Sequence, residues 1–341
     1  NNFFGVNTGR YNTTGCHNFF GGYRAGFCNT TGSYNIFFGN LAGCVNTTGG
    51  NNNFFGNQTG RNNTTGDNNN FIGKCAGFAN TTGGCNNFFG KYAGLCNTTA
   101  THNNFFGTYT GRSNTTGVHN QFMGYGAGIL NNDPQGFALG YSAGSNVSGQ
   151  FNMFMGYNSG GLPKLNTTGN YNMAIGPYTG FNLTSGTRNI IIGTGNSIES
   201  TGRQISTGSD NTLLGYKAGK AIQAGSGNTL IGSNAGASLT SGIDNLVLGY
   251  QSAFNLNTGS YNVVLGSQAG YNMNIGGYNI YTGYHYIKEC KSESKSYSGK
   301  IKDKNNEVDK LNKDLEKYDG LDEKLSTMDD IKEALDKSIK L

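Results

Sequence analysis

A repeat of about seventeen residues organises the first 275 residues of this 341-residue chain. Each unit contains a segment of the form Asn-x-Φ-Φ, in which Φ is an apolar residue, followed by a closing glycine. Seventeen residues are too few for two helices and a turn, and frequent Gly, Asn and Thr disfavour helix. The repeat therefore predicts short strands joined by tight turns. Nine of the fifteen intervals between successive closing glycines are 17 residues long. The sixteen closing glycines are Gly5, Gly21, Gly39, Gly56, Gly73, Gly90, Gly107, Gly124, Gly140, Gly156, Gly176, Gly193, Gly215, Gly232, Gly249 and Gly266.

The predicted fold class is all-β: a parallel β-solenoid or β-roll of about sixteen coils, with one 17-residue unit per coil. The 57 glycines argue against a packed core, but 21 Phe and 20 Tyr argue equally against disorder. At the strand spacing of about 4.8 Å, sixteen coils make a rod of about 75 Å. We expect three segments: the rod at 1–275, a Gly/Tyr-rich and then Ser/Lys-rich linker at 276–300, and an amphipathic helical segment at 301–341.

Two kinds of column follow from stacking the units. An Asn stands four positions before most closing glycines, and such a column of amides is expected to hydrogen-bond from coil to coil. The two residues before the glycine are both apolar, and consecutive strand residues point to opposite faces. One apolar column therefore fills the coil, and the other is expected to be buried between chains, in a homotrimer. The predicted Asn ladder includes Asn52, Asn69, Asn86, Asn103, Asn228 and Asn245, and the apolar pairs include Phe54, Phe55, Phe88, Phe89, Phe105, Phe106, Val247 and Leu248.

The pattern N-x-Φ-Φ-G-x-x-A-G followed by N-T-T-G resembles the head repeats of trimeric autotransporter adhesins. It also resembles the Gly/Asn-rich repeats of phage and other viral tail-fibre proteins. The resemblance covers about residues 1–275 and implies a trimer of left-handed β-rolls followed by a coiled-coil stalk. The chain departs from the adhesins in its longer unit and in lacking their C-terminal membrane-anchor strands, which favours a viral or extracellular fibre.

The segment after residue 300 contains apolar residues in two heptad phases, with a phase slip at Asp319-Gly320. This pattern predicts two amphipathic helices, either as a coiled-coil stalk with a break or as a helical hairpin. A mobile charged tail is the alternative.

Three modifications or ligands are suggested by local patterns. Cys85, His102 and His119 occupy one column of three successive coils and are a candidate metal site, although His at a polar corner of the coil is more often only a surface residue. Cys28 and Cys44 lie in adjacent coils and are a candidate disulfide. Asn-x-Ser/Thr sequences are candidate glycosylation sites unless Asn-Thr-Thr-Gly is only a corner of the coil; they include Asn12, Asn29, Asn46, Asn63, Asn80, Asn97, Asn114 and Asn166.

Residues 1–287 offer only five carboxylates, which fall in different units without the spacing of a catalytic pair. We therefore expect no enzyme, no cofactor and no resident metal. The few basic residues are scattered along the sequence, which disfavours a nucleic-acid partner, and no apolar run is long enough for membrane insertion.

Two functions remain from different classes. The first is a structural fibre or filament protein, a trimeric rod on the surface of a virion or cell. The second is an adhesin or tail fibre that binds a receptor or glycan, with the enlarged units around 161–164 and 196–204 as contact loops. Both imply an extracellular or virion-surface location. Because terminal coils present open strand edges, end-to-end filament growth is a further expectation.

Overall fold

A computed structural model describes residues 1–161, 167–284, 309–310, 313 and 335–336. The chain divides into two compact units, Asn1–His285 and Tyr286–Leu341. In the second unit the described residues are helical and exposed. The predicted coiled coil, the phase slip and the part of the predicted linker after residue 284 lie outside the described residues.

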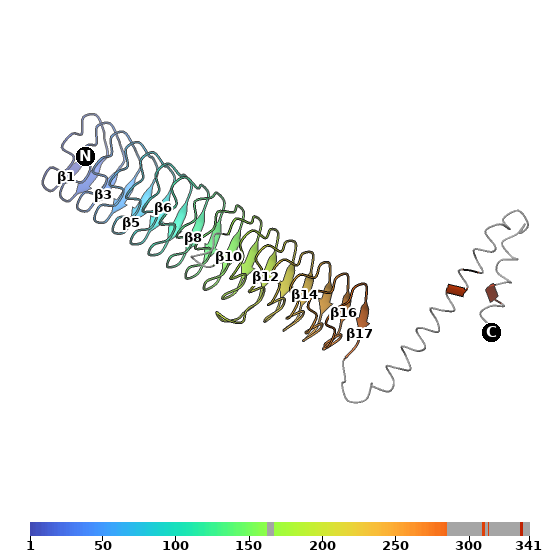
Figure 1. Ribbon diagram of the computed structural model, residues 1–341. Coiled ribbons are helices and arrows are strands. Elements are labelled where there is room, and N and C mark those ends of the chain that lie inside the picture. The colour runs from blue at the N-terminus through green and yellow to red at the C-terminus, as the bar shows by residue number, and fades with distance from the viewer. Residues whose placement is uncertain (162–166, 285–308, 311–312, 314–334, 337–341) are drawn as a thin grey trace, which may run out of the picture. The chain divides into compact units, whose positions relative to one another are not determined.

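The first unit is an all-β parallel solenoid, as Figure 1 shows. Each coil contains one strand of three residues. Each strand pairs in parallel with the strands before and after it in the sequence. The predicted solenoid of about sixteen coils is therefore confirmed. The strands are β1 (Asn2–Phe4), β2 (Phe19–Gly21), β3 (Ile36–Phe38), β4 (Asn53–Phe55), β5 (Asn70–Ile72), β6 (Asn87–Phe89), β7 (Asn104–Phe106), β8 (Gln121–Met123), β9 (Phe137–Leu139), β10 (Met153–Met155), β11 (Met173–Ile175), β12 (Ile190–Ile192), β13 (Thr212–Leu214), β14 (Thr229–Ile231), β15 (Leu246–Leu248), β16 (Val263–Leu265) and β17 (Ile280–Thr282).

The pairing register changes one boundary drawn from the sequence and extends another. Phe4 pairs with Gly21, so Gly21 ends β2 and Gly22 is the glycine that closes the unit. Two adjacent glycines made this choice ambiguous, and with Gly22 the first seven units all become 17 residues long. At the other end, β17 adds a strand within the segment 276–300 that the sequence predicts to be a linker.

The middle residue of each strand fills the interior of its coil. In β2 to β8 this residue is always Phe, with at most 1% of its surface exposed. Successive rings stack nearly parallel, with centroids 4.7–5.1 Å apart. The column reproduces the strand spacing, so the backbone ladder and the ring stack reinforce each other.

The interior changes composition halfway along the rod. After β8, Ala, Ile, Leu and Val replace most of the interior Phe residues. In the same coils, the column seven residues after the closing glycine changes from Asn to aliphatic residues such as Leu183, Ile222 and Leu239, which are buried in the core. An aliphatic pair thus takes over the space that Phe and Asn fill in the first coils, and the coil keeps its cross-section.

A buried Asn column joins the coils four residues before the closing glycine. The side-chain Oδ1 of Asn69 accepts a hydrogen bond from the backbone N–H of Asn86, and its Nδ2 donates to the carbonyl of Gly83, at 3.0 and 2.8 Å. The same pattern recurs along the rod, so the amide pairs backbone groups that a turn leaves unpaired. The predicted ladder residues Asn52, Asn69, Asn86, Asn103, Asn228 and Asn245 all belong to this column.

The interior Phe adds a steric requirement for glycine six residues later, where the backbone is left-handed with Phe or Val inside the coil. Gly60 has φ of +54°, and a Cβ there would lie 2.5 Å from the Phe54 ring. In the coil of β15 the interior residue is Val247, and Ala253 occupies the equivalent position with φ of 47°. The larger side chain therefore excludes a methyl group that the smaller one tolerates.

We predict that Gly60→Ala lowers the local free energy of unfolding of its coil by about 2–4 kcal/mol, from the clash and the left-handed backbone. Adding Phe54→Val should recover about 1 kcal/mol or more relative to the sum of the single changes. Amide hydrogen exchange of the full chain measures both. Ala253→Gly is the control and should cost little, and a Gly60→Ala chain with unchanged exchange would contradict the coupling.

We also predict that Asn69→Ala costs about 1–3 kcal/mol locally, because it leaves the buried backbone N–H of Asn86 unpaired, whereas the Gly83 carbonyl keeps its hydrogen bond from the Nδ2 of Asn80. Asn57→Ala, at an exposed position of the preceding turn, should have almost no effect. Urea midpoints of the two variants compare them directly, and equal midpoints would show that the Asn column does not hold the coils together.

Candidate functional site

The outer face of the sheet consists of the first and third residues of each strand, which point away from the coil interior. The third residue is a large apolar side chain in all fourteen strands from β3 to β16, and none of these side chains is buried. Phe38 and Met123, for example, keep about half of their surface exposed. We call these residues the outer column: Phe38, Phe55, Ile72, Phe89, Phe106, Met123, Leu139, Met155, Ile175, Ile192, Leu214, Ile231, Leu248 and Leu265.

The first residue of each strand forms a second column whose character changes along the rod. In β4 to β7 it is Asn, and the amides hydrogen-bond in sequence at 2.7–2.9 Å. From β9 to β16 it is Phe, Met, Ile, Leu or Val, except for Thr212 and Thr229. No charged residue occurs at either outward position of any strand. The face is therefore uncharged throughout and most apolar in its second half.

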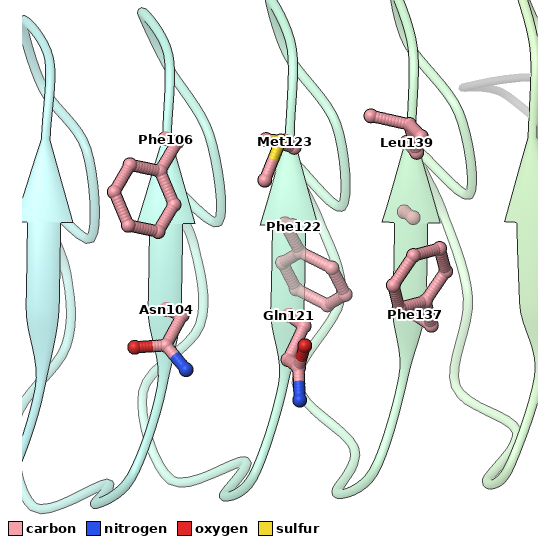
Figure 2. A pocket seen from close by; sticks show the side chains of 8 residues that line it. Asn104, Phe106, Gln121, Phe122, Met123, Phe137 and Leu139 are labelled. Atoms are coloured by element: carbon pink, nitrogen blue, oxygen red, sulfur yellow. The ribbon is translucent and has the colours of Figure 1, made fainter.

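A hollow of about 310 Å³ lies between the two columns at β7 to β9. Figure 2 shows Phe106, Met123 and Leu139 along one side and Asn104, Gln121 and Phe137 along the other. Its lining contains no titratable group, so it offers van der Waals contact and amide hydrogen bonds only. Such a lining suits contact with apolar side chains and holds no group for acid–base chemistry.

The predicted apolar pairs divide between the two sides of the sheet. Phe54, Phe88, Phe105 and Val247 lie in the interior with no exposed surface. Their neighbours Phe55, Phe89, Phe106 and Leu248 lie in the outer column. The alternation of strand side chains thus separates a folding residue from a surface residue within each pair.

The candidate metal column is not a ligand cluster. His102 and His119 stack with ring centroids 4.9 Å apart, and they and Cys85 are exposed. In the described part of the chain, no group of three or more His, Cys, Asp or Glu side chains is placed to hold a metal ion.

The candidate disulfide partners Cys28 and Cys44 are free thiols. Burial raises the pKa of the Cys44 thiol, while the nearby guanidinium groups of Arg24 and Arg61 act in the opposite direction.

The structure argues against glycosylation of the folded rod at the Asn-Thr-Thr-Gly sites. The Asn of this motif is buried, and its Nδ2 donates both to the Asn Oδ1 of the preceding coil and to the carbonyl three residues ahead. In Asn46 these distances are 2.7 and 2.9 Å. No hydrogen or space remains for a glycan. This correction applies to Asn29, Asn46, Asn63, Asn80, Asn97 and Asn114, which have no exposed surface; Asn12 is half-buried, and Asn166 lies outside the described residues.

The carboxylates are either paired with cations or isolated from one another. Hydrogen bonds from Lys217 and Lys220 hold the pKa of Glu199 below its usual value, and the hydrogen bond from Arg188 does the same for Asp210. Burial raises the pKa of Asp133, whose Oδ2 is buried without a hydrogen-bond partner.

Charged residues are separated between the two turns that flank each strand, which the sequence did not reveal. Of the ten Lys and Arg in residues 1–161 and 167–284, nine occupy the first, second or fifth position after the closing glycine or the equivalent position in the enlarged unit. We call these positions the turn face. Four of the five carboxylates lie instead in the turn before a strand, at Asp67, Asp133, Asp210 and Asp244. The nine basic residues are Arg10, Arg24, Arg61, Lys74, Lys91, Arg112, Arg203, Lys217 and Lys220.

No protein-family model, curated protein or solved structure matches the chain. Among the described residues, no helix is long and apolar enough to cross a lipid bilayer. Evidence about function therefore comes from the chemistry of the faces of the rod.

The unpaired Asp133 generates a pH prediction. Because its pKa is raised in the folded state, the folded chain binds more protons than the unfolded chain just above the unfolded pKa, and stability falls as pH rises through the folded pKa. We predict that Asp133→Asn raises the melting temperature at pH 7 and that this gain shrinks at pH 3. The exposed Asp244→Asn is the control, and an Asp133→Asn chain that melts at a lower temperature at pH 7 would contradict this reasoning.

Proposed function

We propose that the chain is a structural rod of an extracellular or virion-surface fibre, and that its outer sheet face packs against copies of itself in a homotrimer. The supporting observation is the outer column, an uncharged apolar face that continues over fourteen strands. Such a face reaches the upper end of the roughly 300–600 Å² that the largest apolar patches of soluble monomers cover, and patches of this size often mark interaction sites. Water contact with it is unfavourable, so burial against an equally apolar surface stabilises an assembly.

A copy of this chain suits the face better than an unrelated protein does. Its own outer column has the same spacing of about 4.8 Å, so side chains can interdigitate in register along the whole length. The strip from β3 to β16 is about 60 Å by 10 Å, or about 600 Å² per chain, whereas stable interfaces bury about 800 Å² per partner. The flanking turns therefore have to contribute to the contact.

The separation of charge favours copies whose rods run parallel. Every strand runs in the same direction, so the basic turn lies along one edge of the outer face and the acidic turn along the other. Rotation of a copy about the rod axis brings the basic edge of one chain beside the acidic edge of the next. An antiparallel pair would place basic edges together, which is repulsive. A cyclic assembly, such as a trimer, satisfies the parallel arrangement.

Two adjacent residues test this proposal. We predict that Phe89→Asp leaves the β signal in circular dichroism intact but shifts the full chain from oligomer to monomer, because each copy then places a carboxylate in the contact. Phe88→Asp should instead unfold several coils, since an unpaired buried charge costs several kcal/mol.

Sedimentation equilibrium gives the mass of each variant, and Thr82→Asp, at an exposed turn, is the control with the same change of charge. A wild-type chain that is a stable, soluble monomer would refute self-assembly through this face. If Phe89→Asp and Phe88→Asp both keep the oligomeric mass of the wild-type chain, the contact between copies lies elsewhere.

A further inference from the structure

The turn face collects cations that are far apart in the sequence. Six of them, from Arg10 to Arg112, fall in the first seven coils, and no carboxylate occupies the turn face in these coils. Six coil-to-coil steps of about 4.8 Å cover about 29 Å. The result is a narrow line of positive charge that runs along the rod axis.

These side chains form a single surface with aromatic rings. The Arg24 guanidinium lies 4.2 Å from the ring centroid of Phe27, and the Arg61 guanidinium lies 5.6 Å from that of Phe78 in the next coil. The rings hold the cations in place while leaving their charge unneutralised. Lys91 over Tyr92 and Arg112 over Tyr109 continue the arrangement.

None of the six cations has a carboxylate partner within 4.0 Å in the described part of the chain, whereas Arg188, Lys217 and Lys220 are all paired. In addition, the Nε atoms of Arg24 and Arg61 are buried without a hydrogen-bond acceptor. Closely spaced, unneutralised cations raise the local concentration of anions, and a polyanion gains more than single ions because it displaces many counterions at once.

A row of tyrosines extends the turn face beyond Arg112. Tyr125, Tyr141 and Tyr157 stack with centroids 5.0–5.1 Å apart and planes within 10° of parallel. The rings cover one another's faces, yet about half of each side chain is exposed. What reaches solvent is therefore ring edge and phenol hydroxyl, which can donate and accept hydrogen bonds.

We propose that the stretch of the turn face from Arg10 to Tyr157 binds an extended acidic polysaccharide, carrying sulfate or carboxylate groups, along the rod axis. Guanidinium and ammonium groups pair with its anionic groups, and the phenol row hydrogen-bonds its hydroxyls. Single-stranded nucleic acid fits less well, because bases need free aromatic faces for stacking and these faces are covered by neighbouring rings. The site contains no residue of the outer column, so a chain that does not assemble through the outer face presents it as well.

The test uses the full chain and heparin fragments of increasing length, with binding followed by calorimetry in 50 and 200 mM salt. Affinity should rise with fragment length until the fragment spans about 29 Å, and it should fall at least tenfold at the higher salt concentration. Lys74→Gln/Lys91→Gln/Arg112→Gln, which changes three exposed residues, should weaken binding at least tenfold.

The matched control is Arg188→Gln/Lys217→Gln/Lys220→Gln, which removes the same charge from cations that already have partners and should change affinity less than twofold. No heparin binding at 50 mM salt, or equal losses in the two triple variants, would overturn the proposal. Oligo(dT) that binds more tightly than heparin of equal charge would assign the face to nucleic acid instead. Sedimentation of both variants shows whether assembly is retained, which separates this result from failure of the outer face.

Discussion

The hydrogen bonds that buried Asn side chains make between coils are the constraint on which the rest of the rod depends. A strand of three residues is too short to position its neighbours by itself, so the turns have to be held at the same spacing. The Asn before each strand does this by pairing a backbone N–H of the next coil and a carbonyl of the turn beyond. Once the turns stack at strand spacing, interior Phe rings stack as well, and outward residues become continuous columns.

The sequence allowed the strands, the Asn column and the inward–outward division of each apolar pair to be predicted, because all three follow from a short period and from alternation. It failed where several physical roles share one residue type. Asn46 matches a glycosylation motif, and only the structure shows both of its amide hydrogens in use. Gly21 and Gly22 were equally good closing glycines until pairing with Phe4 decided between them.

The turn face could not be predicted for a geometric reason. Along the chain, Arg24, Arg61 and Lys74 stand at irregular intervals and look scattered. Their positions within the coil differ as well, at the second, fifth and first residue after the closing glycine. The turn passes through a left-handed residue at its second position, for example Arg24 with φ of 53° and Gln58 with φ of 56°. That reversal of the chain brings the three positions onto one surface. The order of residues in the sequence does not show that the chain reverses there.

The solenoid separates its tasks by position within the coil. Interior positions carry stability, outward strand positions are free to become uncharged, and the two turns can carry opposite charge without disturbing the core. A cyclic assembly about the rod axis would cover the outer column and bring the acidic turn of one chain near the basic turn of the next. In the first seven coils only Asp67 stands on that acidic edge, against six cations on the turn face. Neighbouring chains therefore cannot neutralise the turn face, and its affinity for an external polyanion survives assembly.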